Sequence, residues 1–131
     1  RLPWSADEGK YVSNIIDGEL LMNKEATSIA LQEKISPKIV HIASHAEYLE
    51  SKNSTTIENP LLRSYIVLAG ANNPNNNPED DGYLTALEIT KLDWDGTEMV
   101  VVSACETGRG DIMAGEGIYG LKRAIANPEI V

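Results

Sequence analysis

Runs of mainly apolar residues along the chain predict three strands. Residues 39–43 form one run, which leads into His45, and residues 99–104 form another, which ends at Cys105. Runs of this kind, rich in β-branched residues, are typical of strands that are buried on both faces of a parallel sheet. A third and shorter run, residues 65–69, ends at a glycine. The two longer runs therefore form the centre of the predicted sheet.

Helical spacing and capping residues predict the elements between these strands. Asn23 is a suitable N-cap for a helix that runs to about residue 34, and Pro37 prevents that helix from continuing. Thr85 and Glu88 have the spacing of a capping box, which predicts a second helix over residues 86–92. This second helix precedes the strand that ends at Cys105, where it can serve as a crossover connection. A parallel sheet is the simplest arrangement of such units.

The remaining segments are less strongly patterned. Residues 11–16 predict a strand that ends at the turn formed by Asp17 and Gly18. Residues 72–82 consist mainly of Asn, Pro and acidic residues, and they predict a long exposed loop. A last helix is predicted from about residue 116 until Pro128.

Length and composition restrict the classes of function. A chain of 131 residues is expected to form a single domain, residues 1–131. Its 11 basic and 20 acidic residues give a net charge of −9, and no basic cluster is present, so we expect no direct binding to nucleic acid. No apolar run reaches the roughly 18 residues that cross a membrane, so we expect a cytoplasmic protein. The single cysteine excludes an internal disulfide.

The two long apolar runs each lead to a reactive side chain. If the strands are parallel neighbours, the backbones at His45 and Cys105 lie about 5 Å apart. An imidazolium beside a thiol favours the nucleophilic thiolate and can then protonate a leaving amine. The backbone N–H groups of Cys105 and Ala46 could face the oxyanion of a tetrahedral intermediate.

The residues alone leave other interpretations open. A lone cysteine at the end of a buried strand is often a small core residue. His41 is more simply interpreted as a packed, hydrogen-bonded histidine than as a ligand. The chain has only two histidines and one cysteine, so we expect no metal site and no cofactor.

Several segments, however, closely resemble the CHAT domain, a caspase-like peptidase family. The resemblance runs from about residue 25 to residue 126, in the right order and spacing. It is carried by residues 39–46, 68–72, 80–89, 101–108 and 115–121.

The resemblance implies a three-layer α/β/α caspase-like sandwich with a mainly parallel sheet. It implies a cysteine endopeptidase in which His45 is the base, Cys105 is the nucleophile and a thioester is the intermediate. The substrate would be a protein or peptide, and Asp80 and Asp81 in the acidic loop could contribute to substrate binding. Such domains are commonly attached to TPR-type repeat regions and act in bacterial defence or regulated proteolysis.

Three departures from the family pattern lead to an alternative. One is that the sequence shows no TPR or other partner-binding segment, so we expect a regulatory partner or TPR-type region outside this chain. Ala46 stands where the family usually has glycine, which permits backbone geometries that alanine resists. The sequence stops at Val131, where family members continue with another strand. We therefore expect a fragment of a longer protein, with a sheet that is incomplete at its C-terminal edge. The alternative function is a CHAT-like binding or scaffolding module with weak or no catalytic activity.

Overall fold

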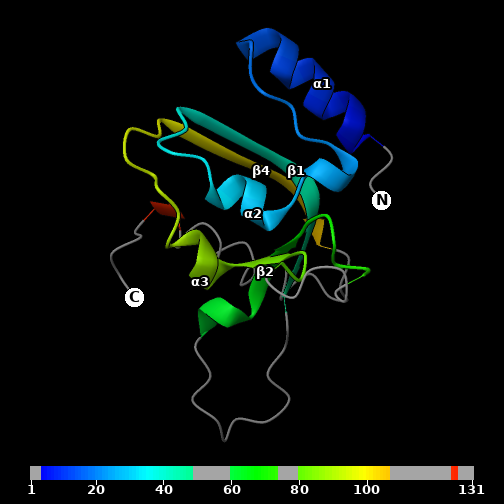
Figure 1. Cartoon of the computed structure of the whole chain (residues 1–131), viewed down its shortest axis with the longest axis vertical. Coiled ribbons are helices and arrows are strands. Elements are labelled where there is room, and N and C mark those ends of the chain that lie inside the picture. The colour runs from blue at the N-terminus through cyan, green and yellow to red at the C-terminus, as the bar shows by residue number, and fades with distance from the viewer. Residues whose placement is uncertain (1–3, 49–59, 74–79, 107–124, 127–131) are drawn as a thin grey trace, which may run out of the picture.

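The computed structural model describes residues 4–48, 60–73, 80–106 and 125–126, which form a mixed α/β fold around a four-stranded sheet (Figure 1). In chain order, the elements are α1 (Ser5–Ile16), η1 (Asn23–Glu25), α2 (Ser28–Gln32), β1 (Ile39–Tyr48), η2 (Pro60–Leu62), β2 (Ser64–Val67), β3 (Tyr83–Thr85), α3 (Ala86–Ile89) and β4 (Met99–Glu106). None of the helices within the described residues is long and apolar enough to cross a membrane. The last predicted helix and the glycines after Cys105 lie outside the described residues, apart from two helical residues at 125–126.

The sheet is mixed, with strand order β3-β2-β1-β4. β1 and β4 are parallel, as predicted for the two long apolar runs, and they pair from Ile39↔Met99 to Ala46↔Glu106. β2 is antiparallel to both β1 and β3. The prediction of a mainly parallel sheet is therefore wrong for the described strands. Among the described residues, no helix lies between β2 and β3, and antiparallel neighbours need no helical crossover, whereas α3 lies between β3 and β4.

The N-terminal segment is a helix, and the prediction of a strand over residues 11–16 is wrong. α1 carries Asp7 and Glu8 in its first turn, where acidic side chains favour a helix, and it ends at Asp17, which has the left-handed φ of 51°. The apolar pairs at positions 11–12 and 15–16 fit a helical period as well as a strand, so periodicity alone could not separate the two.

The helix that was predicted to begin at Asn23 begins later in the structure. Asn23 has a φ of 54° and starts only a short 3₁₀ turn. Thr27 is the N-cap of α2, because its backbone is extended and its side chain accepts a hydrogen bond from the Ala30 N–H at 3.0 Å. The long helix predicted over residues 23–34 is thus two short helical segments.

The predicted capping box is confirmed. The Thr85 hydroxyl accepts from the Glu88 N–H at 3.2 Å, and the Glu88 carboxylate accepts from the Thr85 N–H at 2.8 Å. Leu84 and Ile89 flank the box and are 0% and 2% exposed. α3 stops at Ile89, which is shorter than the predicted helix.

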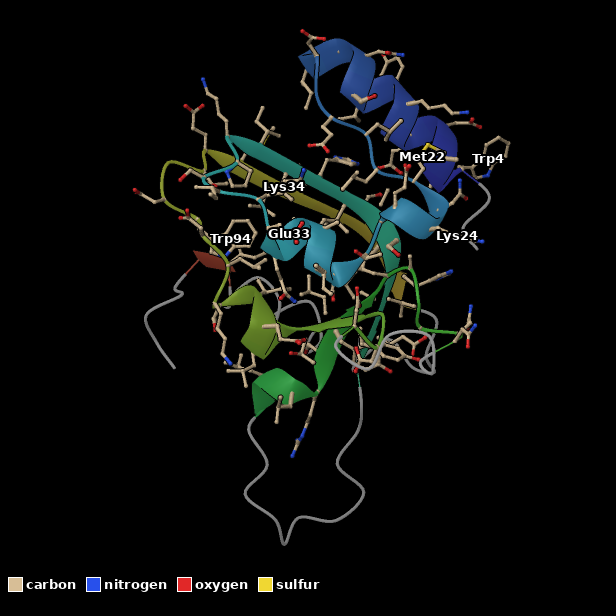
Figure 2. All side chains as sticks on the ribbon, viewed as in Figure 1. Trp4, Met22, Lys24, Glu33, Lys34 and Trp94 are labelled. Atoms are coloured by element: carbon tan, nitrogen blue, oxygen red, sulfur yellow. The ribbon has the colours of Figure 1, made fainter. Side chains whose placement is uncertain are left out.

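The hydrophobic core lies on one face of the sheet. Its buried members are Ala46, Ile66, Leu84, Ala86 and Ile89. Trp94 packs against this cluster beside α3, where its Nε1–H donates to the Ile89 carbonyl at 2.8 Å (Figure 2).

α1 lies away from α2 and α3 (Figure 1) and has no buried residue of its own. It contacts β1 through Glu8, whose carboxylate lies 2.9 Å from Nε2 of His41. The three-layer arrangement stays a prediction.

Candidate active site

His45 and Cys105 stand opposite each other in neighbouring parallel strands. Their Cα atoms are register partners in the β1–β4 pair. Adjacent strands lie about 4.8 Å apart, and register partners share one face of a sheet. The backbone therefore brings together the two residues that the sequence singled out.

Both strands extend beyond these residues. β1 continues to Tyr48 and β4 continues to Glu106, so His45 and the Cys105 backbone lie within strands. The strand predicted from the run over residues 39–43 continues to Tyr48, because β2 pairs with β1 from His45 to Tyr48 and extends the strand.

The ring of His45 is only partly exposed, and its Nδ1 atom is buried without a hydrogen-bond partner among the described residues. Buried polar atoms are usually satisfied, and leaving one unpaired costs roughly 1–3 kcal/mol. His45 also lines a cavity of about 660 Å³. An unpaired ring nitrogen beside a cavity can accept or donate a proton if a reacting group enters.

His41 is the packed, hydrogen-bonded histidine that the sequence predicted. Its Nε2 atom lies 2.9 Å from Glu8, and its side chain is 16% exposed. His41 and His45 are four positions apart in the same extended strand, so they lie on one face of the sheet. Among the described residues, no group of three potential metal ligands gathers at this face or elsewhere.

Ala46 is held inside the sheet. It pairs with Ile66 of β2 on one side and with Glu106 of β4 on the other, and it is 8% exposed. Its backbone is extended rather than left-handed, so the conformational freedom of glycine is not used at this position.

Asp80 is buried and forms several hydrogen bonds. It is 7% exposed, its Oδ1 atom accepts from the Ser28 hydroxyl at 2.8 Å and from the Gly82 N–H at 3.1 Å, and its Oδ2 atom accepts from the Ile29 N–H at 3.5 Å. Asp81 is exposed and accepts from the Tyr83 N–H at 2.9 Å. The bonds of Asp80 attach the acidic loop to the N-terminus of α2, whereas Asp81 remains accessible. Their role in substrate binding stays a prediction.

We expect Asp80→Ala to lower the free energy of unfolding by roughly 2–3 kcal/mol, because the buried Ser28 hydroxyl and the Gly82 N–H lose their acceptor. Urea denaturation followed by circular dichroism measures this change. Asp81→Ala is the matched control, since its carboxylate is exposed, and we expect it to cost less than about 1 kcal/mol. Equal losses for the two variants would contradict the structural role of Asp80.

Sequence reasoning missed a polar and aromatic cluster on the His45 face. Glu47, Tyr65 and Tyr83 belong to it: the Tyr65 hydroxyl donates to Glu47 at 2.8 Å, and the two tyrosine rings meet edge to face at a centroid distance of 5.2 Å. Burial, followed by the hydrogen bond to Glu47 and its negative charge, raises the pKa of Tyr65 to about 12. Strand alternation could have placed Glu47 on this face, had β1 been predicted to continue past His45.

Comparison with known proteins identifies a family. The family model of the CHAT domain matches residues 1–127. Searches of the curated proteins and of the solved structures give no match. The CHAT domain family is caspase-like and related to cysteine peptidases. Because the match spans nearly the whole sequence and includes both strands of the candidate site, the chain belongs to the CHAT domain family.

Proposed function

We propose that this chain is a cysteine endopeptidase domain that hydrolyses peptide bonds through Cys105 and His45. The observation that carries the proposal is the register pairing of these two residues in parallel strands β1 and β4. The family match supports the reaction class. The unpaired Nδ1 of His45 supports a role for its ring beyond packing.

In the proposed reaction, the His45 imidazole takes the proton of the Cys105 thiol. The thiolate then attacks the carbonyl carbon of the scissile peptide bond and forms a tetrahedral oxyanion. The backbone N–H groups of Cys105 and Ala46 are the proposed donors to that oxyanion. As the C–N bond breaks, the imidazolium gives its proton to the leaving amine, and a thioester remains. Water, deprotonated by His45, hydrolyses the thioester and restores the thiol.

The position of Ala46 favours a second candidate, a CHAT-like binding module with weak or no activity. Ala46 has strand partners on both sides, so its N–H lies between backbones rather than in an open loop. An oxyanion site that lacks one donor loses roughly 10²–10³ in rate. This candidate predicts that partner binding persists when Cys105 is replaced by serine.

The test is the cleavage of a proteome-derived peptide library, with new N-termini identified by mass spectrometry. We expect the unmodified chain to generate a reproducible cleavage motif, and we expect Cys105→Ala and His45→Ala to abolish it. His41→Ala is the matched control and should retain the motif, because His41 is bonded to Glu8. No cleavage by the unmodified chain, or equal cleavage by Cys105→Ala, would reject the peptidase and leave the binding module.

A further inference from the structure

The polar and aromatic cluster of Glu47, Tyr65 and Tyr83 shares a face of the sheet with the candidate active site. In β1, Glu47 comes two residues after His45, so both project to the same side. Register partners also share a face, which places Cys105 opposite His45. In the same way, Tyr65 of β2 stands opposite Glu47, and Tyr83 joins through its ring contact with Tyr65. The cluster is therefore a neighbour of the proposed catalytic pair.

Glu47 lies within reach of a substrate side chain. Two residues of an extended strand span about 7 Å, which is the separation of the Glu47 and His45 Cα atoms. With the usual spacing of strands, the Cα atoms of Glu47 and Cys105 are roughly 8 Å apart across the sheet. An extended peptide has the same rise per residue. A substrate side chain can thus meet Glu47 when it stands about one to three residues from the bond that Cys105 attacks.

The Glu47 carboxylate is exposed, and one neutral donor holds it. Its Oε2 atom accepts from the Tyr65 hydroxyl at 2.8 Å. None of the ion pairs within the described residues uses Glu47; they are Lys34–Glu19, Lys38–Glu98 and His41–Glu8. A carboxylate has two oxygens and accepts several hydrogen bonds, so Glu47 retains the capacity to accept from a cation.

The two tyrosines adapt this carboxylate to a cationic side chain. Burial, followed by the bond to Glu47, raises the pKa of Tyr65 to about 12, so its hydroxyl keeps its proton at neutral pH and remains a donor. The Tyr65 and Tyr83 rings meet edge to face beside the carboxylate. Aromatic faces attract Lys and Arg side chains. A fixed carboxylate beside two aromatic rings thus suits an ammonium or a guanidinium group.

The charge of the whole chain favours the same class of ligand. The net charge is −9, and a negative surface attracts cationic peptides and repels acidic ones. Glu47 therefore acts within a field of its own sign, which adds to the preference for a basic side chain over an acidic one.

We propose that Glu47 binds a lysine or arginine side chain of the substrate, about one to three residues from the scissile bond, and that Tyr65 positions its carboxylate. This inference rests on the proposed peptidase function and adds a specificity-determining residue to it. The cationic group donates hydrogen bonds to the carboxylate, and the tyrosine rings contact the aliphatic stem. An acidic side chain at the same place is repelled.

The first test is the cleavage motif from the peptide library. We expect Lys and Arg to be enriched at one fixed position within about three residues of the cleaved bond, and Glu47→Gln to lose this enrichment. Glu98→Gln is the matched control. Glu98 is also an exposed carboxylate, but it precedes β4 at the end of the sheet away from His45, so this variant should keep the enrichment.

A matched pair of peptides separates recognition from folding. One carries the selected Arg or Lys, and the other carries the neutral citrulline or acetyl-lysine in its place. We expect Glu47→Gln to lower kcat/KM at least about tenfold for the basic peptide and less than about twofold for the neutral one. Tyr65→Phe, which removes only the hydroxyl that holds the carboxylate, should cause a smaller loss, again confined to the basic peptide. Glu47→Lys should reverse the preference towards a peptide with Glu at that position.

The outcomes distinguish this inference from the function on which it rests. Cleavage without a basic enrichment, a motif that Glu47→Gln leaves unchanged, or equal losses on the two peptides would overturn the inference and leave the peptidase in place. No cleavage by the unmodified chain would reject both. Circular dichroism verifies that the variants are folded, and the reversal by Glu47→Lys cannot arise from a general loss of structure.

Discussion

Replacing His45 with alanine is expected to slow the alkylation of Cys105 by iodoacetamide at least about tenfold at pH 7. A cysteine with an ordinary pKa near 8.5 is only about 3% ionised at this pH, and only the thiolate reacts. A neighbouring imidazolium can make the thiolate the major form. Because His45 is the register partner of Cys105, its removal should return the thiol to ordinary reactivity. Rates are measured by intact-protein mass spectrometry, which is unambiguous since the chain has a single cysteine.

His41→Ala is the matched control for this experiment. His41 lies on the same strand and the same face, four residues before His45, but it is bonded to Glu8 of α1. In the His41→Ala variant, we expect the alkylation rate of Cys105 to remain within about twofold of the rate in the unmodified chain. If His45→Ala and His41→Ala react at the same rate as the unmodified chain, the two residues do not form a dyad.

Gly82→Ala is expected to lower the free energy of unfolding by roughly 4 kcal/mol, a large share of the roughly 5–15 kcal/mol that is typical of a folded domain. Gly82 has a φ of +77°, and a Cβ atom there would lie 1.9 Å from the Ala71 nitrogen and 2.5 Å from the Gly70 carbonyl carbon. Both contacts are with backbone, which cannot rotate away. The Gly82 carbonyl also accepts from the Leu68 N–H at 2.7 Å, so any shift disturbs the link between the loop and the end of β2.

Gly96→Ala separates backbone strain from steric overlap. Gly96 has a similar φ of +73°, but no atom lies within 4 Å of the position that an added Cβ would take. The Gly96→Ala substitution should therefore lower the free energy of unfolding by only about 1 kcal/mol, which is the cost of the left-handed conformation. Urea denaturation of both variants measures the difference. Similar losses at the two glycines would show that the close approach between Gly82 and Ala71 is relieved at little cost.

The parts of the fold that could be predicted depend on local signals. The β1–β4 pair follows from two long apolar runs, and α3 follows from the capping box of Thr85 and Glu88. The mixed sheet could not be predicted, because antiparallel pairing of β2 leaves no clear mark in the short run over residues 65–69. α1 cannot be distinguished from a strand by pattern alone, because its short apolar pairs fit both periods.

In the candidate site too, local signals predicted some features, and contacts between distant residues decided the others. The juxtaposition of His45 and Cys105 could be predicted, since both follow apolar runs that pair in parallel. The burial of Asp80 could not, because it depends on a hydrogen bond to Ser28, 52 residues earlier in the chain. A stretch of polar residues predicts an exposed loop unless a distant partner is known. Likewise, Glu47 joins the His45 face only because β2 extends β1.

The loose attachment of α1 has a consequence for local stability. No residue of α1 is buried, and Trp4 and Tyr11 are 77% and 69% exposed, so little apolar area holds the helix to the sheet. Segments with few buried contacts open at a small fraction of the global free energy of unfolding. α1 should therefore detach as a cooperative unit while β1 and β4 remain folded. Because α1 forms a wall of the cavity that His45 also lines, each such opening uncovers the cavity without unfolding the sheet.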